Sequence, residues 1–394
     1  MNNHLPVLII GGGISGITAA VELAETGRKA VLIEKEPYLG GKVSRFNNYF
    51  PKMCPPSCGL EINYRRIRSN PRIEYYTGAQ INRIEGCSGQ FRVTVALDAR
   101  LINNRCTSCG ECARVCQVPG AIRVPGGLSF PRKFTVDASL CERERCKKCE
   151  EVCRYDAIQL KAVPTEVEIS VSAIIAATGW ESYPAATIEG YRYTGEPDVI
   201  TNLEFEEMLA ASSTGGQPLA RPSDGKRPER IAFVQCAGSR DRRHLPYCSA
   251  VCCSASLKQA LTLVREYQGI ETTIYYIDLR VPGRNETLLR EAQEEGSIRF
   301  IRGRVGRILE PSRDGRLEVE VEDITKERKI RESFDMVVLA VGMVPNPAAP
   351  GVQQGRYGFL DEAQQPGVIC TASSTRPMDV AASVRDATAA ALKA

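Results

Sequence analysis

The sequence predicts an α/β fold in which two strand–helix–strand units flank a small cysteine-rich insertion. The first unit begins at residue 5, where an apolar strand leads into a glycine-rich loop and a helix. A second unit begins near residue 230 with the same order of elements, and eight of the sixteen cysteines lie between the two in two runs of four. Because strands that alternate with helices are typical of parallel sheets, we expect a doubly wound architecture with one inserted domain.

Composition narrows the class of protein before any motif is considered. Hydrophobic residues make up 43% and charged ones 25% of the 394 residues, which is typical of a soluble chain of two or three domains. The net charge of +4 is spread over 51 basic and 47 acidic residues, so there is no footprint for nucleic acid. No apolar run approaches the roughly 20 residues of a membrane span, and the first residues lack the signals of a secretory leader. We expect a cytoplasmic protein, in which dense cysteine indicates metal or redox chemistry rather than disulfides.

The glycines of the first unit have the spacing of a dinucleotide site. The strand Leu5–Ile10 is followed by Gly11-Gly-Gly13-Ile-Ser-Gly16 and then by a helix. Gly11 permits a tight turn, Gly13 lets a pyrophosphate approach the backbone, and Gly16 lets the helix pack closely on the strand. The helix N-terminus offers free N–H groups to the phosphates. Glu34, at the end of the second strand, is placed to accept the hydroxyls of a ribose.

Later motifs favour FAD over NAD as the dinucleotide. Leu39–Lys42 contains the glycine pair that two-dinucleotide flavoproteins carry just past the acidic residue. Ile174–Gly179 resembles the Ala-Thr-Gly strand of that class, and Val337–Gly342 resembles its counterpart at the return from the second nucleotide domain. We therefore expect FAD, held in a fold like that of thioredoxin reductase. The residues expected to bind it are Gly11, Gly13, Ser15, Gly16, Glu34, Lys35, Gly40, Gly41, Lys42, Thr178, Gly179 and Gly342.

The closing flavin motif departs from the usual pattern at one position. Gly367–Ile369, followed by a helix over Val380–Lys393, resembles that motif. Where many relatives place an aspartate on the ribityl chain of the flavin, this chain has Cys370-Thr-Ala-Ser373-Ser. The side chain that meets the ribityl group therefore stays open, with Ser373 near the expected place.

The two runs of cysteines in the insertion match the pattern of a bacterial two-cluster ferredoxin. In that pattern three cysteines of each run hold one [4Fe–4S] cube and the fourth holds the other cube. The second run has four residues in its first gap, where the pattern has two. A pair of zinc ribbons is the alternative, and two complete four-cysteine runs make it a poor second. The pattern assigns one cluster to Cys106, Cys109, Cys112 and Cys153, and the other to Cys116, Cys141, Cys146 and Cys149.

The second strand–helix–strand unit has cysteines where a nicotinamide cofactor would need glycines. Its strand Ile231–Gln235 and helix Ser254–Tyr267 frame a loop in which Gly238 alone does not make a phosphate loop. We expect this nucleotide domain to be degenerate and its NAD(P)H site to be lost. Four structural thiols are one interpretation of the loop cysteines, but beside a predicted flavin a third [4Fe–4S] site is favoured. The four cysteines are Cys236, Cys248, Cys252 and Cys253.

Three features carry a resemblance to a known family. They are the string Tyr49-Phe-Pro-Lys-Met-Cys-Pro-Pro-Ser-Cys58, the ferredoxin insertion, and the string that begins Phe233-Val-Gln-Cys-Ala-Gly-Ser-Arg-Asp241 and continues to Lys258. On these the chain resembles the A subunit of heterodisulfide reductase, and it looks closest to the A subunit of the quinone-interacting membrane-bound oxidoreductase complex. The resemblance implies that the four loop cysteines hold a cluster beside the flavin, and that Lys258 faces the flavin N5. An ammonium there stabilises negative charge on reduced flavin and can exchange a proton with it.

The resemblance also implies an oxidoreductase subunit that transfers electrons between partners. In the proteins it resembles most, this subunit joins a homologous flavin subunit and a membrane haem/iron–sulfur subunit. The complex links menaquinol to adenylylsulfate reductase. We accordingly expect a cytoplasmic chain held at the inner face of the membrane by its partners. One alternative is the flavoprotein subunit of a soluble electron-bifurcating heterodisulfide reductase. Two others are a self-sufficient NAD(P)H-dependent disulfide reductase that uses Cys54 and Cys58, and a cofactor-free scaffold.

A few side chains stay outside these motifs. Cys54 and Cys58 could form a redox pair, a structural pair or a contact with a partner's cofactor. Cys87 and Cys370 are expected to be ordinary buried thiols. His244 lies in the second cysteine loop, where it could tune a cluster through hydrogen bonds to its ligands.

The predicted domains follow from these motifs. A surface loop is expected over Ser212–Pro228, which is rich in proline, glycine and serine. The FAD-binding domain is expected in three parts, at residues 1–98, 163–225 (with the linker) and 343–394. The ferredoxin insertion is expected at 99–162, and the degenerate nucleotide domain with its [4Fe–4S] site at 226–342.

Overall fold

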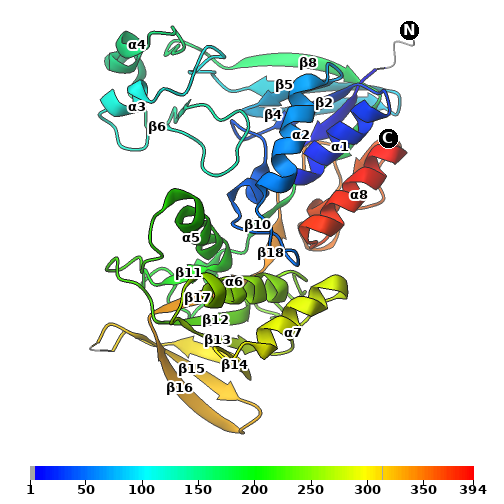
Figure 1. Ribbon diagram of the computed structural model, residues 1–394. Helices are drawn as coiled ribbons and strands as arrows, with labels where there is room; N and C mark the ends of the chain where they lie inside the picture. Colours follow the sequence, from blue (N-terminus) through cyan, green and yellow to red (C-terminus); the bar gives the residue numbers. More distant parts are fainter. Residues whose placement is uncertain (1–4, 313) are drawn as a thin grey trace.

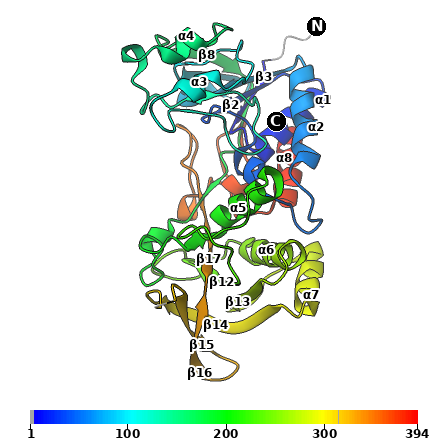
Figure 2. The same cartoon turned by 60° about the vertical axis from the view of Figure 1, so that its left-hand side comes forward.

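The structure of the protein, a computed structural model, describes residues 5–312 and 314–394. Two large lobes lie one above the other, and a small third lobe projects from the upper one (Figures 1 and 2). The first strand, β1 (Val7–Ile10), and the last helix, α8 (Val380–Lys393), both belong to the upper lobe. The upper lobe is therefore assembled from segments far apart in the sequence.

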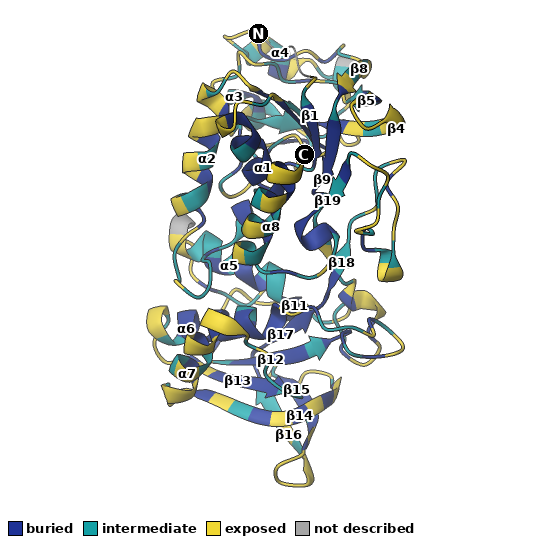
Figure 3. Ribbon diagram, turned by 90° about the vertical axis from the view of Figure 1, so that its right-hand side faces the viewer, coloured by how far each residue is buried: buried dark blue, intermediate teal, exposed yellow. Residues whose placement is uncertain are grey.

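A five-stranded parallel sheet forms the centre of the upper lobe. Its strands are short apolar runs buried on both faces (Figure 3), as expected for a parallel sheet covered on both sides. Three helices cover one face: α1 (Ile14–Glu25), α2 (Ser57–Ser69) and α8. In sheet order the strands are β19 (Val368–Cys370), β9 (Ala173–Ala176), β1, β2 (Ala30–Glu34) and β3 (Ile73–Thr77).

The other face of this sheet is covered by a three-stranded antiparallel sheet. Phe91, Val93 and Val95 on its middle strand pack against Leu8 and Ile33. Cys87 is exposed at the turn between its first two strands, so the prediction of a buried thiol there is wrong. The strands in sheet order are β4 (Ala79–Cys87), β5 (Gln90–Leu97) and β8 (Thr165–Val171).

The lower lobe is built on a seven-stranded sheet. Its first five strands are parallel and its last two return antiparallel. One face carries three helices, which bury Phe205, Leu257 and Leu288 against it. The helices are α5 (Asn202–Gly215), α6 (Cys252–Glu266) and α7 (Glu286–Glu294). The strands in sheet order are β11 (Val199–Thr201), β17 (Met336–Val341), β12 (Arg230–Ala237), β13 (Glu271–Tyr276), β14 (Ile298–Ile308), β15 (Leu317–Asp323) and β16 (Arg328–Phe334).

The third lobe, here called the cysteine lobe, is inserted between β5 and β8. It has a small core of its own, which includes Cys112, Cys149 and Leu160. Phe130 attaches it to the upper lobe, since this ring stacks on Tyr64 with 5.1 Å between ring centres. The Tyr64 hydroxyl donates a hydrogen bond of 2.7 Å to the carbonyl of Leu128. Its elements are α3 (Glu111–Val115), β6 (Ile122–Arg123), β7 (Thr135–Val136) and α4 (Lys148–Val152).

A two-stranded ribbon joins the two large lobes. Its strands, β10 (Trp180–Ser182) and β18 (Met343–Pro345), pair antiparallel. The predicted surface loop from Ser212 begins later, because α5 continues to Gly215 and ends at Gly216 in the left-handed conformation. No helix within the described ranges is long and apolar enough to cross a bilayer. The short 3-10 helices are Gly41–Arg45, Arg143–Arg145, Ala185–Thr187, Gly283–Asn285, Arg356–Gly358 and Ala372–Ser374.

The glycine loop gives the first testable prediction. A Cβ at Gly16 would lie 1.8 Å from the carbonyl oxygen of Gly11, so Gly16→Ala forces β1 and α1 apart. We expect it to lower the free energy of unfolding by about 3 kcal/mol or more, measured by chemical denaturation. The matched control is Gly59→Ala in α2, where a Cβ would meet no atom within 4 Å and a better helix former stabilises by up to about 1 kcal/mol. Equal stabilities of the two variants would contradict the packing argument.

Candidate functional site

The glycine loop after β1 opens into a groove along the upper lobe. Gly11 has a φ of 110°, and a Cβ there would lie 2.3 Å from the carbonyl oxygen of Ala177 on the neighbouring strand. Gly13 begins α1 without any side-chain cap, and the nearest atom to a Cβ there is 4.0 Å away. The first N–H groups of α1 thus face open space, which suits a phosphate.

Glu34, at the end of β2, fixes this loop through hydrogen bonds. Its carboxylate accepts hydrogen bonds from the backbone N–H of Gly12 (2.5 Å) and of Glu36 (2.8 Å). Burial raises the pKa of Glu34, and these two hydrogen bonds oppose that rise. The residue also lines the groove, so it can meet a ribose while it holds the loop.

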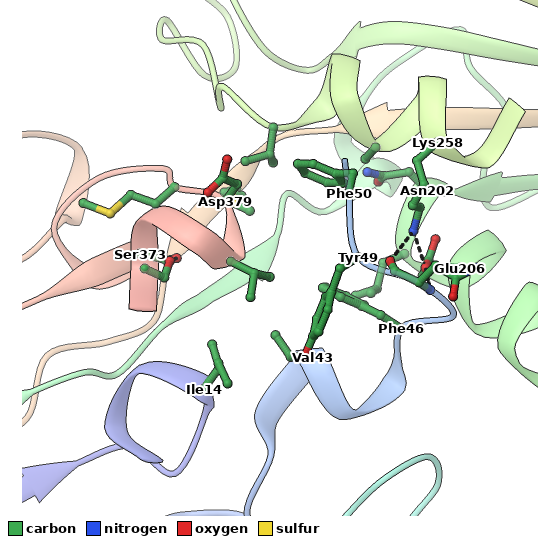
Figure 4. Close-up of a pocket in the computed structure, with 18 of the residues that line it drawn as sticks. Ile14, Val43, Phe46, Tyr49, Phe50, Asn202, Glu206, Lys258, Ser373 and Asp379 are labelled. Carbon is green, nitrogen blue, oxygen red and sulfur yellow. Dashed lines mark hydrogen bonds and ion pairs between the residues drawn. The ribbon is translucent and has the colours of Figure 1, made fainter. Parts of the chain in front are cut away.

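Two cavities follow each other along the groove. The first, of about 1050 Å³, contains the glycine loop and Glu34. The second, of about 800 Å³, lies between the two large lobes and is drawn in Figure 4. Both are lined by Ile14, Val43, Trp180 and Ser373, so they meet there. The predicted residues that line the first cavity are Gly11, Gly13, Ser15, Glu34, Lys35, Gly41, Lys42, Thr178 and Gly179.

Three predicted cofactor residues do not line either cavity. Gly16 and Gly40 support the loop from behind, where a Cβ on either would clash with neighbouring atoms. Gly342 lies farther away, and a Cβ there would meet Ser239 and Leu245 of the cysteine-bearing loop in the lower lobe. Its neighbour Met343 lines the second cavity instead.

Ser373 stands where the two cavities meet. The sequence left the partner of the ribityl chain open, and Ser373 now has the position for it. Its hydroxyl lies 3.3 Å from that of Ser383 on α8. Asp386, on the same helix, fixes the preceding turn by accepting hydrogen bonds from the Thr371 hydroxyl and the Ala372 N–H.

The second cavity is lined by both apolar and polar side chains. Its aromatic and sulfur-containing side chains suit a flat ring system. Phe50 lies beside Lys258 on α6, which points toward Glu206 on α5 (Figure 4). The apolar residues are Phe46, Tyr49, Phe50, Trp180, Met343 and Met378.

Lys258 and Glu206 form a buried ion pair at the wall of this cavity. The two residues are only 4% and 3% exposed. The Lys258 ammonium donates to Glu206 and also to the carbonyl of Asn48, at 3.1 Å. Glu206 accepts further hydrogen bonds from the Gln259 amide (2.9 Å) and the Asn47 N–H (2.9 Å). Burial lowers the pKa of Lys258, and Glu206 acts against that shift.

The four loop cysteines of the lower lobe gather where β12 ends and α6 begins. Cys236 is the penultimate residue of β12, and Cys252 and Cys253 are the first two residues of α6. Burial raises the pKa of the Cys252 thiol well above its ordinary value, and the nearby Cys253, Cys236 and Cys248 raise it further. Four thiolates are the donor set of a [4Fe–4S] cube, so the residue types at this junction of β12 and α6 fit such a cluster.

Four of the ferredoxin-like cysteines line one cavity of about 340 Å³ in the cysteine lobe: Cys106, Cys109, Cys112 and Cys153. These are the three neighbours and the one distant cysteine that the crossing pattern assigns to one cluster. Of the other set, Cys149 has a pKa of about 11, raised by burial and then by Cys141. Within the described ranges no three His, Cys, Asp or Glu side chains are close enough to hold a single metal ion.

The remaining candidates lie at the edges of these sites. Cys54 is joined to the second cavity through Tyr49, whose N–H donates a 2.7 Å hydrogen bond to the Cys54 carbonyl. Cys58 is exposed in the first turn of α2. His244 pairs its Nδ1 with the Tyr183 hydroxyl at 2.9 Å, so the described contacts direct it away from the cysteines.

Comparisons with known proteins agree with the site. A family model described as FAD dependent oxidoreductase matches residues 6–61. The chain is 34% identical over 417 residues to the A subunit of the H(2):CoB-CoM heterodisulfide,ferredoxin reductase of Methanothermobacter marburgensis, a match that covers 98% of this chain and 63% of that protein. It is 38% identical over 380 residues to the iron-sulfur A subunit of the CoB–CoM heterodisulfide reductase of Methanocaldococcus jannaschii, covering 90% and 57%. The chain is similar over nearly its whole length to heterodisulfide reductase A subunits. It spans less than two thirds of the length of these relatives.

The match to the FAD dependent oxidoreductase model covers the glycine loop, Glu34 and the start of α2. Solved structures agree on the fold. Thioredoxin reductase of T. acidophilum superimposes with a TM-score of 0.54 at 14% identity, covering 98% of this chain and 96% of that one. Thioredoxin reductase of Lactococcus lactis gives 0.54 at 16% identity, covering 98% and 97%. The prediction of an α/β, FAD-binding Rossmann fold of this type is confirmed.

The buried ion pair gives a prediction for stability. Glu206→Gln leaves the Lys258 ammonium buried without a carboxylate, so we expect a loss of about 3 kcal/mol in the free energy of unfolding at pH 7. The folded variant would then bind fewer protons than the unfolded chain, whose lysine titrates normally, so its stability should rise with pH. Chemical denaturation at pH 7 and pH 9 measures both effects.

The neighbouring residue provides the control. Glu207 pairs with Arg45 nearer the surface, where both side chains are about a third exposed, so Glu207→Gln should cost less than about 1 kcal/mol. The double variant Glu206→Gln/Lys258→Met should recover much of the lost stability, because no charge stays buried. Equal losses for Glu206→Gln and Glu207→Gln would contradict the role given to the buried pair.

Proposed function

We propose that this chain carries FAD and three [4Fe–4S] clusters and transfers electrons as one subunit of a heterodisulfide-reductase-like complex. One observation carries the proposal. Four cysteines gather at the carboxyl end of β12 and the start of α6, where a nicotinamide dinucleotide would otherwise place its phosphates. The position expected for a soluble hydride donor thus holds the donor set of a cluster.

The loop that would bind a nicotinamide cofactor is filled by protein. A Cβ on Gly238 would lie 2.8 Å from the ring of Tyr183, so this glycine serves packing and not the approach of a phosphate. Gln235, at the end of the same strand, is buried, and its amide has no hydrogen-bond partner among the described residues. The packing of Gly238 favours a cluster over NAD(P)H at this point.

Helix α6 brings the cysteines close to the second cavity, which is here called the flavin cavity. Val251 and Ala255 line that cavity, and Cys252 and Cys253 lie between them in the sequence. One helical turn spans about 5.4 Å, so these two cysteines lie within one turn of the residues that line the cavity. When bound, FAD supplies two-electron chemistry and the clusters supply one-electron steps.

Lys258 would serve the flavin from the same helix. Its ammonium is held at the cavity wall by Glu206 and by the carbonyl of Asn48. In that position Nζ can stabilise negative charge at the flavin N5 and exchange a proton with it. The aromatic and methionine side chains that line this cavity exclude water from it.

The cysteine lobe would continue the electron path outward. We assign one cluster to the cavity between Cys106, Cys109, Cys112 and Cys153, and a second to Cys116, Cys141, Cys146 and Cys149. Cys109 of this lobe is exposed, and so is Cys58 on α2 of the upper lobe. The lobe projects from the upper one (Figure 2), which suits exchange of electrons with another protein.

We further propose that the complex is of the quinone-interacting, membrane-bound kind. The chain would then lie in the cytoplasm, held at the inner face of the membrane by a haem/iron–sulfur subunit together with a homologous flavin subunit. It would relay electrons between the quinone pool and adenylylsulfate reductase. The alternative is a soluble electron-bifurcating heterodisulfide reductase, which the names of relatives such as the A subunit of the heterodisulfide,ferredoxin reductase favour.

Metal analysis tests the number of clusters. Anaerobically purified chain should contain about twelve irons and as much acid-labile sulfide, from three cubes of four irons each. Cys252→Ser should lower the iron content by about four, and Cys153→Ser should affect a different cluster in electron paramagnetic resonance spectra. Cys370→Ser, at a half-buried thiol outside the three sets, is the control and should keep all the iron. About eight irons in the unaltered chain would remove the cluster at α6.

Reduction of the flavin tests the loss of the nicotinamide site. NADH or NADPH alone should leave the flavin of the purified chain oxidised under anaerobic conditions, whereas dithionite should reduce it, as followed by absorbance. Rapid reduction by either nucleotide would revive the disulfide reductase alternative, with Cys54 and Cys58 as its thiol pair.

A further inference from the structure

Two arginines, Arg240 and Arg280, lie near the cysteines at the junction of β12 and α6. Neither of them is a predicted ligand of the cluster. Arg240 follows the strand that carries Cys236, and its charge opposes the rise that burial causes in the pKa of that thiol. Arg280 lies in the loop after β13, and its pKa is raised first by Asp278 and then by Cys248. Both arginines hydrogen bond to Asp278, whose backbone carbonyl lies next to the Cys253 sulfur.

A shared carboxylate holds both guanidiniums in place. Asp278 accepts from Arg240 through Oδ1 and from Nε of Arg280 through Oδ2, the latter at 3.1 Å. The Asp278 carbonyl lies 4.0 Å from the Cys253 sulfur. Two cations and one anion leave a net positive charge on this side of the thiols. The arrangement is fixed, because the pairing of Arg240 and Arg280 with one carboxylate sets the position of both side chains.

We propose that Arg240 and Arg280 set the reduction potential of the flavin-proximal cluster, as positioning residues that raise it. This inference rests on the proposed function, since it needs the cluster at Cys236, Cys248, Cys252 and Cys253. Four thiolates give such a cluster a net negative charge, and the electron that reduces it adds one more without any proton. Fixed positive charge beside the sulfurs stabilises the reduced form more than the oxidised one, and hydrogen bonds to the sulfurs act in the same direction.

The consequence concerns the flow of electrons between flavin and cluster. A cluster that is easier to reduce accepts an electron from the flavin more readily and returns it less readily. Arg240 is three quarters buried and Arg280 about half exposed, so solvent screens the charge of Arg240 less. We therefore expect Arg240 to contribute the larger share.

Redox titration of the full chain tests the inference. The potential of the third cluster is measured by electron paramagnetic resonance on anaerobically purified protein poised at a series of potentials. Arg240→Gln and Arg280→Gln should each lower the equilibrium constant for reduction of that cluster by about tenfold, which is about 59 mV for a one-electron couple. Arg240→Lys keeps the charge and should recover most of the shift. The two clusters of the cysteine lobe should keep their potentials in every variant.

Arg243 offers a matched control in the same loop. Its side chain is 80% exposed and pairs with Asp241 rather than with a cysteine, so Arg243→Gln removes the same charge without touching the thiols. Its effect on the third cluster should be small, because exposed charges are screened. If Arg240→Gln prevents the cluster from assembling, the potential can still be measured in Arg280→Gln, because the side chain of Arg280 is more exposed.

The outcomes separate this inference from the proposed function. Unaltered chain with only about eight irons overturns both. Three clusters whose third potential is the same in Arg240→Gln, Arg280→Gln and unaltered chain overturn the inference alone. An equal shift in Arg243→Gln also overturns it, because the effect would then be one of general charge and not of contact with the sulfurs.

Discussion

The carboxylate of Glu206 is the interaction on which the arrangement of the site depends. It accepts hydrogen bonds from Lys258 and Gln259 on α6 and from the backbone of Asn47 and Asn48 in the upper lobe. One buried charge thus joins the cavity wall to the helix that begins with two cysteines. A buried carboxylate without such partners would be costly, and two of its four hydrogen-bond partners belong to the upper lobe. The flavin cavity lies between the same two lobes.

The lower lobe has five parallel strands, and the segment from the end of β12 to the start of α6 contains four cysteines and one glycine. Its parallel sheet still brings the carboxyl end of β12 next to the start of α6, which is where ligands of such sheets bind. In this chain cysteines occupy that place, and the loop is packed against Tyr183. A scaffold that orients a hydride donor toward a flavin can equally orient a cluster, because only the distance to the flavin has to be kept.

The sequence predicts candidate site residues wherever a short pattern has a definite chemistry, as in the glycine loop, Glu34 and the cysteine runs. The structure brings Glu34 and most of the glycine loop to one cavity, and Cys153 and its distant partners to another. Glu206 could not be found in this way. It belongs to the acidic run Glu204-Phe-Glu206-Glu, which looks like the solvated face of a helix, and its burial depends on packing between lobes. Gly342 and Cys87 were misjudged for the same reason, since long-range contacts decide whether a residue faces a cavity, a loop or solvent.

The central claim is that a cluster takes the place of a nicotinamide beside the flavin. Anomalous scattering at the iron edge, from crystals grown without oxygen, tests it most directly. We predict three compact iron peaks, two in the cysteine lobe and one between the end of β12 and the start of α6, next to the density of the flavin. Density for iron in the cysteine lobe alone, with Cys236, Cys248, Cys252 and Cys253 present as free thiols, would contradict it.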